Sequence, residues 1–165
     1  MAKKSGKNKS GLISTNKTVA ENRRAKFEYF IEEKFECGLM LKGSEVKSLR
    51  HGQCSINEAH AFERGEEIFI HNMHIPEYSQ AGPHLQHEPA REKKLLLRSS
   101  EIKKLIGSVA RAGYTLVPLR VYFNDKGIAK LELGLAKGKK LHDKRETEKQ
   151  RDWNKQKSRV MKDYS

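Results

Sequence analysis

The chain has 165 residues, enough for one compact domain with appendages, and 33% of them are charged against 36% hydrophobic. Alternating apolar segments exclude a wholly disordered chain, and no apolar run reaches the roughly 18 residues of a membrane span. The N-terminus lacks the apolar stretch of a signal peptide, and Cys37 and Cys54 follow no disulfide or metal-binding pattern. We therefore expect a cytoplasmic protein with one folded core, no membrane contact and disordered ends.

The formal net charge of +13 is carried by the two ends of the chain. Residues 1–26 hold 8 basic residues against 1 acidic residue, residues 137–165 hold 11 against 5, and the 110 residues between them hold 15 of each. Basic arms on a neutral body favour a polyanionic partner, because they release the counterions of phosphates on binding. Arms that serve only solubility are the alternative.

Hydrophobic periodicity predicts a mainly β protein with short helices. Strict alternation of apolar and polar residues is typical of half-buried strands, and apolar residues spaced three and four apart are typical of helices. In chain order we predict a strand at 27–42, a helix at 44–50 capped by Ser44, a hairpin of strands at 56–62 and 67–75, an exposed loop at 76–89, a strand at 95–97, a helix that is capped by Ser100 and ends before Gly113, and strands at 114–123 and 128–136.

This order of elements has too few helices for a parallel sheet, so we expect an antiparallel one. The first strand is longer than most and contains Gly38, which permits the bend of a strand that curls around a barrel. The predicted fold is therefore an OB-type antiparallel barrel with two or three short helices and a disordered basic C-terminal tail. A two-layer α+β sheet is the alternative.

We divide the chain into a flexible basic N-terminal arm at 1–21, an OB-type barrel at 22–136, of a kind that commonly binds nucleic acid, and a basic tail at 137–165. The tail has a helix-forming composition but few large apolar side chains. In a helix, Trp153, Val160 and Met161 would form one thin apolar stripe that only a partner could cover. We expect the tail to be disordered when free and helical when bound.

No motif of a catalytic, nucleotide-binding or metal site occurs, so we expect no enzyme activity, no cofactor and no metal. His142 beside Asp143, Lys144 and Arg145 could form the acid–base cluster of a ribonuclease, but this segment has no core to hold the groups in place. Stacking of His142 on a base, with Lys144 and Arg145 on phosphates, suits the composition better. A carboxylate such as Glu36 is useful on an RNA surface only as an acceptor for amino groups or 2′-hydroxyls.

Three segments resemble a known family. They are NRRAKFEYFIEEKFECGLMLKGSEVKSLRHG, REKKLLL and LELGLAKGKKLHDKRE, and together they resemble the SmpB family of SsrA-binding proteins from about Asn22 to Met161. The resemblance implies an OB-type barrel that binds the tRNA-like domain of transfer-messenger RNA (tmRNA). It also implies delivery of that RNA, with elongation factor Tu, to bacterial ribosomes stalled on messages without a stop codon. There the protein stands in for the missing anticodon arm.

The resemblance also implies which residues act. The positions that match the RNA-binding barrel surface of the family are Asn22, Glu36, Leu96 and Lys130. The positions that match contacts with the decoding centre and the messenger channel are His142, Asp143, Lys144, Arg145, Val160 and Met161. The role of Leu96 is left open between an RNA contact and a core leucine, because the KLLL run must bury one side. A general single-strand binder or an accessory ribosomal protein is the competing function, although neither explains the apolar stripe of the tail.

Overall fold

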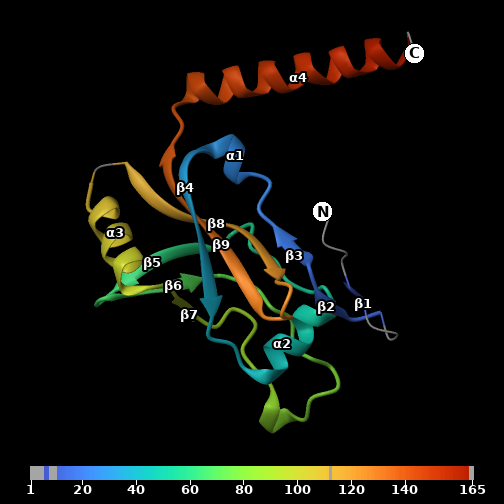
Figure 1. Cartoon of the computed structure of the whole chain (residues 1–165), viewed down its shortest axis with the longest axis vertical. Coiled ribbons are helices and arrows are strands. Elements are labelled where there is room, and N and C mark those ends of the chain that lie inside the picture. The colour runs from blue at the N-terminus through green and yellow to red at the C-terminus, as the bar shows by residue number, and fades with distance from the viewer. Residues whose placement is uncertain (1–5, 8–10, 112, 164–165) are drawn as a thin grey trace.

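The computed structural model describes residues 6–7, 11–111 and 113–163 (Figure 1). In chain order its elements are β1 (Gly6–Lys7), β2 (Ile13–Thr15), β3 (Lys17–Glu21), α1 (Ala25–Glu28), β4 (Tyr29–Leu39), α2 (Gly43–Arg50), β5 (His60–Arg64), β6 (Glu67–His71), the 3-10 helix η1 (Pro83–Leu85), β7 (Lys93–Leu96), α3 (Ser99–Val109), β8 (Tyr114–Phe123), β9 (Ala129–Gly138) and α4 (Leu141–Asp163). Among these residues no helix is both long enough and apolar enough to cross a membrane.

Six antiparallel strands close into a ring. β8 pairs with β5, and the pairing continues through β6, β7, β4 and β9 back to β8. β3 adds a strand along β8 outside the ring. This is the OB-type barrel that the sequence predicted, and both the β5–β6 and the β8–β9 hairpins are confirmed.

The interior of the barrel is apolar, since the strands alternate inward apolar and outward polar side chains. α2 and α3 each add one fully buried leucine to this core, Leu49 and Leu105. Both cysteines are free thiols, and Cys37 lies inside the barrel. The helices therefore cover the barrel, while the outer faces of several strands stay open to solvent.

The first long strand begins at Tyr29 and not at residue 27, because α1 precedes it. Ala25 of α1 is buried against Val117 and Leu119 of β8. This tertiary contact selects one helical turn where the local alternation of apolar residues had favoured a strand. The strand predicted over 67–75 ends at His71, because the backbone of Asn72 turns into the left-handed region at a φ of 58°.

The N-terminal boundary also differs from the expected flexible arm at 1–21. β3 pairs along β8, and Ile13 of β2 is buried. Arg50 of α2 ties this segment down, with its Nη1 donating to the carbonyl oxygen of Ile13 at 2.9 Å. A short polar strand gains its stability from the ladder that it joins, which its own sequence does not reveal. The sheet thus begins at Lys17, before the predicted barrel boundary at 22, and residues 1–5 and 8–10 lie outside the described residues.

Glutamates, and not the predicted serines, cap α2 and α3, and the N-cap residues Lys42 and Arg98 each lie two residues before the predicted serine. The N–H of Lys42 donates to Glu45 Oε1 at 2.7 Å, and the N–H of Arg98 donates to Glu101 Oε1 at 3.2 Å. Each glutamate is the third residue of its helix, where its charge also meets the positive end of the helix dipole. The hydroxyl of Ser44 instead contacts His87.

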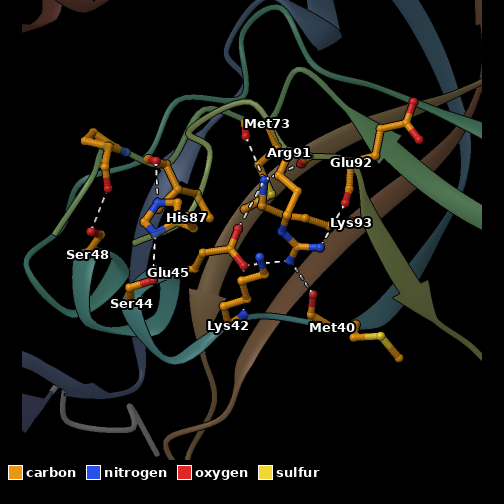
Figure 2. Close-up of polar contacts among 12 residues, drawn as sticks. Met40, Lys42, Ser44, Glu45, Ser48, Met73, His87, Arg91, Glu92 and Lys93 are labelled. Atoms are coloured by element: carbon orange, nitrogen blue, oxygen red, sulfur yellow. Dashed lines mark hydrogen bonds and ion pairs between the residues drawn. The ribbon is translucent and has the colours of Figure 1, made fainter. Parts of the chain in front are cut away.

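The loop after β6 is not exposed throughout, as the sequence had suggested. His87 is only 3% exposed, and its Nε2 donates to the carbonyl oxygen of Ile75 at 2.8 Å. Its Nδ1 lies 2.8 Å from Ser44 Oγ of α2 and accepts from that hydroxyl in the neutral ring (Figure 2). The loop therefore closes over α2 through a buried polar contact.

A second buried polar cluster, centred on Glu45 and Lys93, joins α2 to β7 (Figure 2). Both side chains are 0% exposed. Glu45 Oε1 accepts from Arg91 Nη2 at 2.6 Å and from the N–H of Lys42 at 2.7 Å. Lys93 Nζ lies 3.6 Å from Glu45 Oε2 and donates to the carbonyl oxygens of Arg91 at 2.7 Å and Met73 at 3.0 Å.

This arrangement keeps the carboxyl group ionised. Burial acts to raise the pKa of Glu45, but hydrogen bonds from Arg91 and Lys42 and the nearby charge of Lys93 outweigh burial, so the pKa lies below its ordinary value. Burial lowers the pKa of Lys93, and the charge of Glu45 opposes that effect. The two charges thus depend on one another inside the fold.

Replacing Glu45 by Gln should lower the free energy of unfolding by about 3–5 kcal/mol, because Lys93 stays buried while it loses its counter-charge. Denaturant unfolding of the variant and the parent measures the difference. Glu67→Gln is the matched control, since Glu67 pairs with Lys94 near the surface and its loss should cost less than about 1 kcal/mol. Equal losses in the two variants would contradict the importance of the buried pair.

The same pair predicts a dependence of stability on pH. The pKa of Glu45 is lower in the folded chain than in the unfolded chain, where it is about 4.3, so the stabilisation is present above that value and is lost as the pH falls toward the folded pKa. In urea unfolding between about pH 6 and about pH 3, the gap between the parent and Glu45→Gln should therefore narrow below about pH 4. A gap that stays constant would show that the ionised carboxylate is not its source.

Candidate nucleic-acid interface

Three of the four predicted barrel residues meet around Gly38 on the outer face of the barrel. Gly38 of β4 is the cross-strand partner of both Leu96 of β7 and Lys130 of β9. Glu36 lies two residues before Gly38 and so shares its face. Pairing of β4 with both β7 and β9 brings these side chains together from three separate strands.

Leu96 belongs to the surface and not to the core. It is 45% exposed, whereas Leu95 beside it is buried. A Cβ added to Gly38 would lie 3.1 Å from the Cβ of Leu96, so the absence of a side chain at Gly38 leaves room for Leu96 to lie against β4. The KLLL run therefore buries Leu95 and exposes Leu96. An RNA contact at Leu96 stays a prediction.

Glu36 is held by a side chain that the sequence analysis missed. The hydroxyl of Tyr122 in β8 donates to Glu36 Oε2, across the intervening strand β9. The guanidinium of Arg120 lies over the Tyr122 ring at 4.2 Å from its centroid. Arg120 Nε also donates to Glu132 Oε2 at 3.1 Å, and its Nη1 donates to Thr18 Oγ1 at 3.3 Å. A polar network therefore crosses β3, β8, β9 and β4.

Two clefts open beside Arg120, which lines both of them. One, of about 430 Å³, is also lined by Glu36 and Tyr122. The other, of about 550 Å³, is lined by Asn22, Phe30 and further residues of β4 and β9. Both clefts combine cationic, carboxylate and aromatic groups, which suits a ligand with charge, hydrogen-bond donors and flat rings.

Asn22 lies apart from the other three barrel residues and is buried. Its Nδ2 donates to the carbonyl oxygen of Pro118 at 3.1 Å, and its N–H donates to the carbonyl oxygen of Leu119 at 2.8 Å. The N–H of Ala25 in turn donates to the carbonyl oxygen of Asn22 at 3.3 Å. Asn22 thus anchors the connection between β3 and α1 to β8, at the wall of the larger cleft.

The predicted tail residues lie on α4, which projects from the barrel at one end of the molecule (Figure 1). β9 itself runs to Gly138, two residues past the predicted end of the barrel. The helix expected for the bound tail is present over Leu141–Asp163, and the disorder of the free tail stays a prediction.

Along α4 the predicted residues fall into two groups. The first turn, beside the barrel, contains His142, Asp143, Lys144 and Arg145. There, His142 Nε2 lies 3.1 Å from Asp143 Oδ1, and Asp143 Oδ2 accepts from the N–H of Lys140 at 3.3 Å. Val160 and Met161 follow about 27 Å further along the helix and are 55% and 65% exposed. The exposed stripe that includes Trp153 thus has no cover within the described chain.

The base of α4 is fixed by Lys139, whose role the sequence analysis missed. Lys139 Nζ donates to the carbonyl oxygen of Lys26 at 2.8 Å and to Thr147 Oγ1 at 2.9 Å. It lies 5.0 Å from the centroid of the Phe30 ring, and its N–H donates to the carbonyl oxygen of Glu28 at 2.9 Å. One cation therefore connects α1, β4 and α4.

The side chains that were missed differ in how visible they are in the sequence. Arg120 and Tyr122 alternate with the buried Val121 and Phe123, so their outward direction can be read from the pattern, but their partners cannot. Lys139 is one lysine among many in a basic run, and nothing local singles it out. Across the residues that the structure describes, no group of three or more His, Cys, Asp or Glu could hold a metal ion.

The closed antiparallel ring, with α2 and α3 packed on its core and a polar network on its outer face, defines an OB-type barrel protein. More narrowly, the chain belongs to the SmpB family, because the family model described as "SmpB protein" matches residues 19–163. A curated relative named SsrA-binding protein, from Allorhizobium ampelinum, is 60% identical over 149 residues, which cover 90% of this chain and 94% of the relative. Another of that name, from Caulobacter vibrioides, is 58% identical over 147 residues, covering 89% and 96%.

A chain in a solved structure is similar in fold and sequence. That structure is described as "tmRNA-SmpB: a journey to the center of the bacterial ribosome". The chain in it is 45% identical, with a TM-score of 0.61, and the match covers 73% of this chain and 84% of that one.

Replacing Lys139 by Ala should loosen α4 from the barrel, since it removes the contacts to Lys26, Thr147 and Phe30 together. Backbone heteronuclear NOE values for residues 141–163 should fall relative to the parent. Lys140→Ala is the matched control, because the backbone N–H of Lys140 still reaches Asp143 after the substitution. Values that are already low in the parent would contradict fixation by Lys139 and would support the predicted disorder of the free tail.

Proposed function

We propose that this protein binds the tRNA-like domain of tmRNA and delivers it, with elongation factor Tu, to stalled bacterial ribosomes for rescue and tagging of the nascent peptide. The observation that carries the proposal is the separation of two surfaces on one chain. A polar barrel face surrounds Gly38, and a basic helix with an exposed apolar stripe extends from the other end of β9. Membership of the SmpB family and the similarity to a chain in a solved structure described by the words tmRNA, SmpB and bacterial ribosome support it.

On the barrel face, each residue has a distinct use toward folded RNA. Lys130 offers a cation to a phosphate, and the exposed Leu96 offers an apolar contact to a sugar or base. Glu36 accepts hydrogen bonds from an amino group or a 2′-hydroxyl. A phosphate has no hydrogen-bond donor, so it cannot make this contact. Asn22 contributes through the position of α1 and the wall of the larger cleft.

The tail takes the place of the anticodon arm. His142 is exposed at the start of α4 and can stack on a base of the decoding centre, while Lys144 and Arg145 contact phosphates and Asp143 caps the helix. Val160 and Met161, at the far end, engage the vacant messenger channel. Elongation factor Tu enters with the aminoacylated tmRNA, and peptide transfer belongs to the ribosome, so we assign no catalytic residue.

Truncation after Gly138 and the substitution Glu36→Ala should have opposite effects. The truncation leaves β9 complete, so affinity for tmRNA should stay within about twofold of the parent, while tagging of stalled peptides should be lost. Glu36→Ala should weaken tmRNA binding about tenfold or more and leave the tail intact. Binding assays and a reconstituted tagging reaction measure the two effects, and equal loss of both activities in the truncated chain would refute this division of roles.

Competition binding at near-physiological salt separates this function from general single-strand binding. The competitors are the tRNA-like domain of tmRNA, an ordinary tRNA and an unstructured RNA of equal length. Contacts made only by basic arms weaken steeply with salt and ignore the fold of the RNA. A strong preference for the tRNA-like domain is the expected result, and equal binding of all three RNAs would favour the general binder.

A further inference from the structure

Tyr122 occupies the middle of the barrel face. It is the cross-strand neighbour of Lys130, which in turn neighbours Gly38 of β4. From this position its hydroxyl reaches diagonally across β9 to Glu36 Oε2, although the two residues are 86 positions apart in the chain. The contact therefore depends on the pairing of β9 with both β4 and β8.

We propose that Tyr122 is a positioning residue, whose hydroxyl holds one oxygen of the Glu36 carboxylate so that the other faces the RNA as an acceptor. The inference rests on the proposed function and adds to it a determinant of RNA selectivity. Tyr122 lies outside the three segments that carry the resemblance to the family, so its role follows from the contact with Glu36 alone.

The chemistry of the surface gives the hydroxyl a purpose. A carboxylate at the end of a mobile side chain turns away from approaching phosphates, and its rotamer freedom must be lost on binding. A donor that already occupies Oε2 fixes the direction of Oε1 before the RNA arrives, which reduces the entropy lost in the complex. The remaining oxygen can then select a hydrogen-bond donor over a phosphate.

The surroundings keep Tyr122 in its role as a donor. A tyrosine hydroxyl of ordinary pKa already keeps its proton at neutral pH, and burial and the bond to Glu36 raise the pKa of Tyr122 further. Arg120 covers one face of the ring at 4.2 Å and is itself bonded to Glu132 and Thr18. The ring is thus restrained by groups from β3 and β9.

The same strands contain a matched control. Tyr114, at the opposite end of β8, donates its hydroxyl to Glu32 Oε1 of β4 at 3.1 Å. This bond joins the same residue types, on the same two strands, away from the surface around Gly38. Removing it tests what the loss of a tyrosine hydroxyl does to the barrel alone.

The first experiment measures affinity for the tRNA-like domain of tmRNA. Tyr122→Phe should weaken binding about five- to tenfold, the scale of one ordinary hydrogen bond, and Tyr114→Phe should change it less than about twofold. Both variants should unfold thermally close to the parent. Equal effects of the two variants, or parent-like binding by Tyr122→Phe, would overturn the proposal.

A double-mutant cycle tells positioning from direct contact. If Tyr122 acts through Glu36, then Tyr122→Phe should cost nothing further in a Glu36→Ala background. An equal loss in both backgrounds would mean that Tyr122 contacts the RNA itself, which overturns the proposal. Glu36→Asp supplies a second variant, because its shorter side chain breaks the bond to the Tyr122 hydroxyl while Tyr122 itself is unchanged. Parent-like RNA binding by Glu36→Asp would also count against positioning.

The outcomes also distinguish this inference from the function on which it rests. Loss of binding in Glu36→Ala, with none in Tyr122→Phe, would leave tmRNA recognition standing and remove the positioning role. Parent-like binding by Glu36→Ala would also contradict the positioning role of Tyr122, because Glu36 would then make no useful contact with the RNA. Failure of the parent protein to prefer the tRNA-like domain would instead refute the proposed function.

Discussion

The buried contact between Glu45 and Lys93 fixes the register on which the outer face of the barrel depends. Lys93 and Leu95 point inward along β7, so Lys94 and Leu96 point outward. A slip of one residue would exchange these faces, and an aliphatic run such as KLLL resists that slip poorly by itself. An inward ammonium group is costly unless it meets its counter-charge, and Glu45 at the start of α2 supplies that charge in one register only.

Pairing of β7, β4, β9 and β8 then assembles the candidate surface from distant parts of the chain. Leu96 reaches Gly38 because β7 pairs with β4, and Tyr122 reaches Glu36 because β9 pairs with both β4 and β8. At the other end of β9 the chain leaves the barrel, where Lys139 connects the base of α4 to α1. The two surfaces are therefore joined by one strand, which is a suitable arrangement for a protein that binds one RNA and carries it to a second.

Residues whose role follows from the local sequence pattern were predictable. Residues whose role depends on a contact with a distant part of the chain were not. Alternation predicted the long strands and the two hairpins. It did not predict α1, because a single helical turn is selected by the burial of Ala25 against β8. Asn22 was named through resemblance alone, and the structure gives it an anchoring contact that no local pattern suggests.

The sequence by itself determined the class of the fold, the division of charge between body and ends, and the family, since these depend on composition, periodicity and contiguous motifs. Only the tertiary structure decided that Lys93 is buried, that Leu96 is on the surface and that Tyr122 holds Glu36. The physical reason is that such contacts depend on pairing between strands far apart in the chain, where closure and register, and not the local sequence, choose the neighbours.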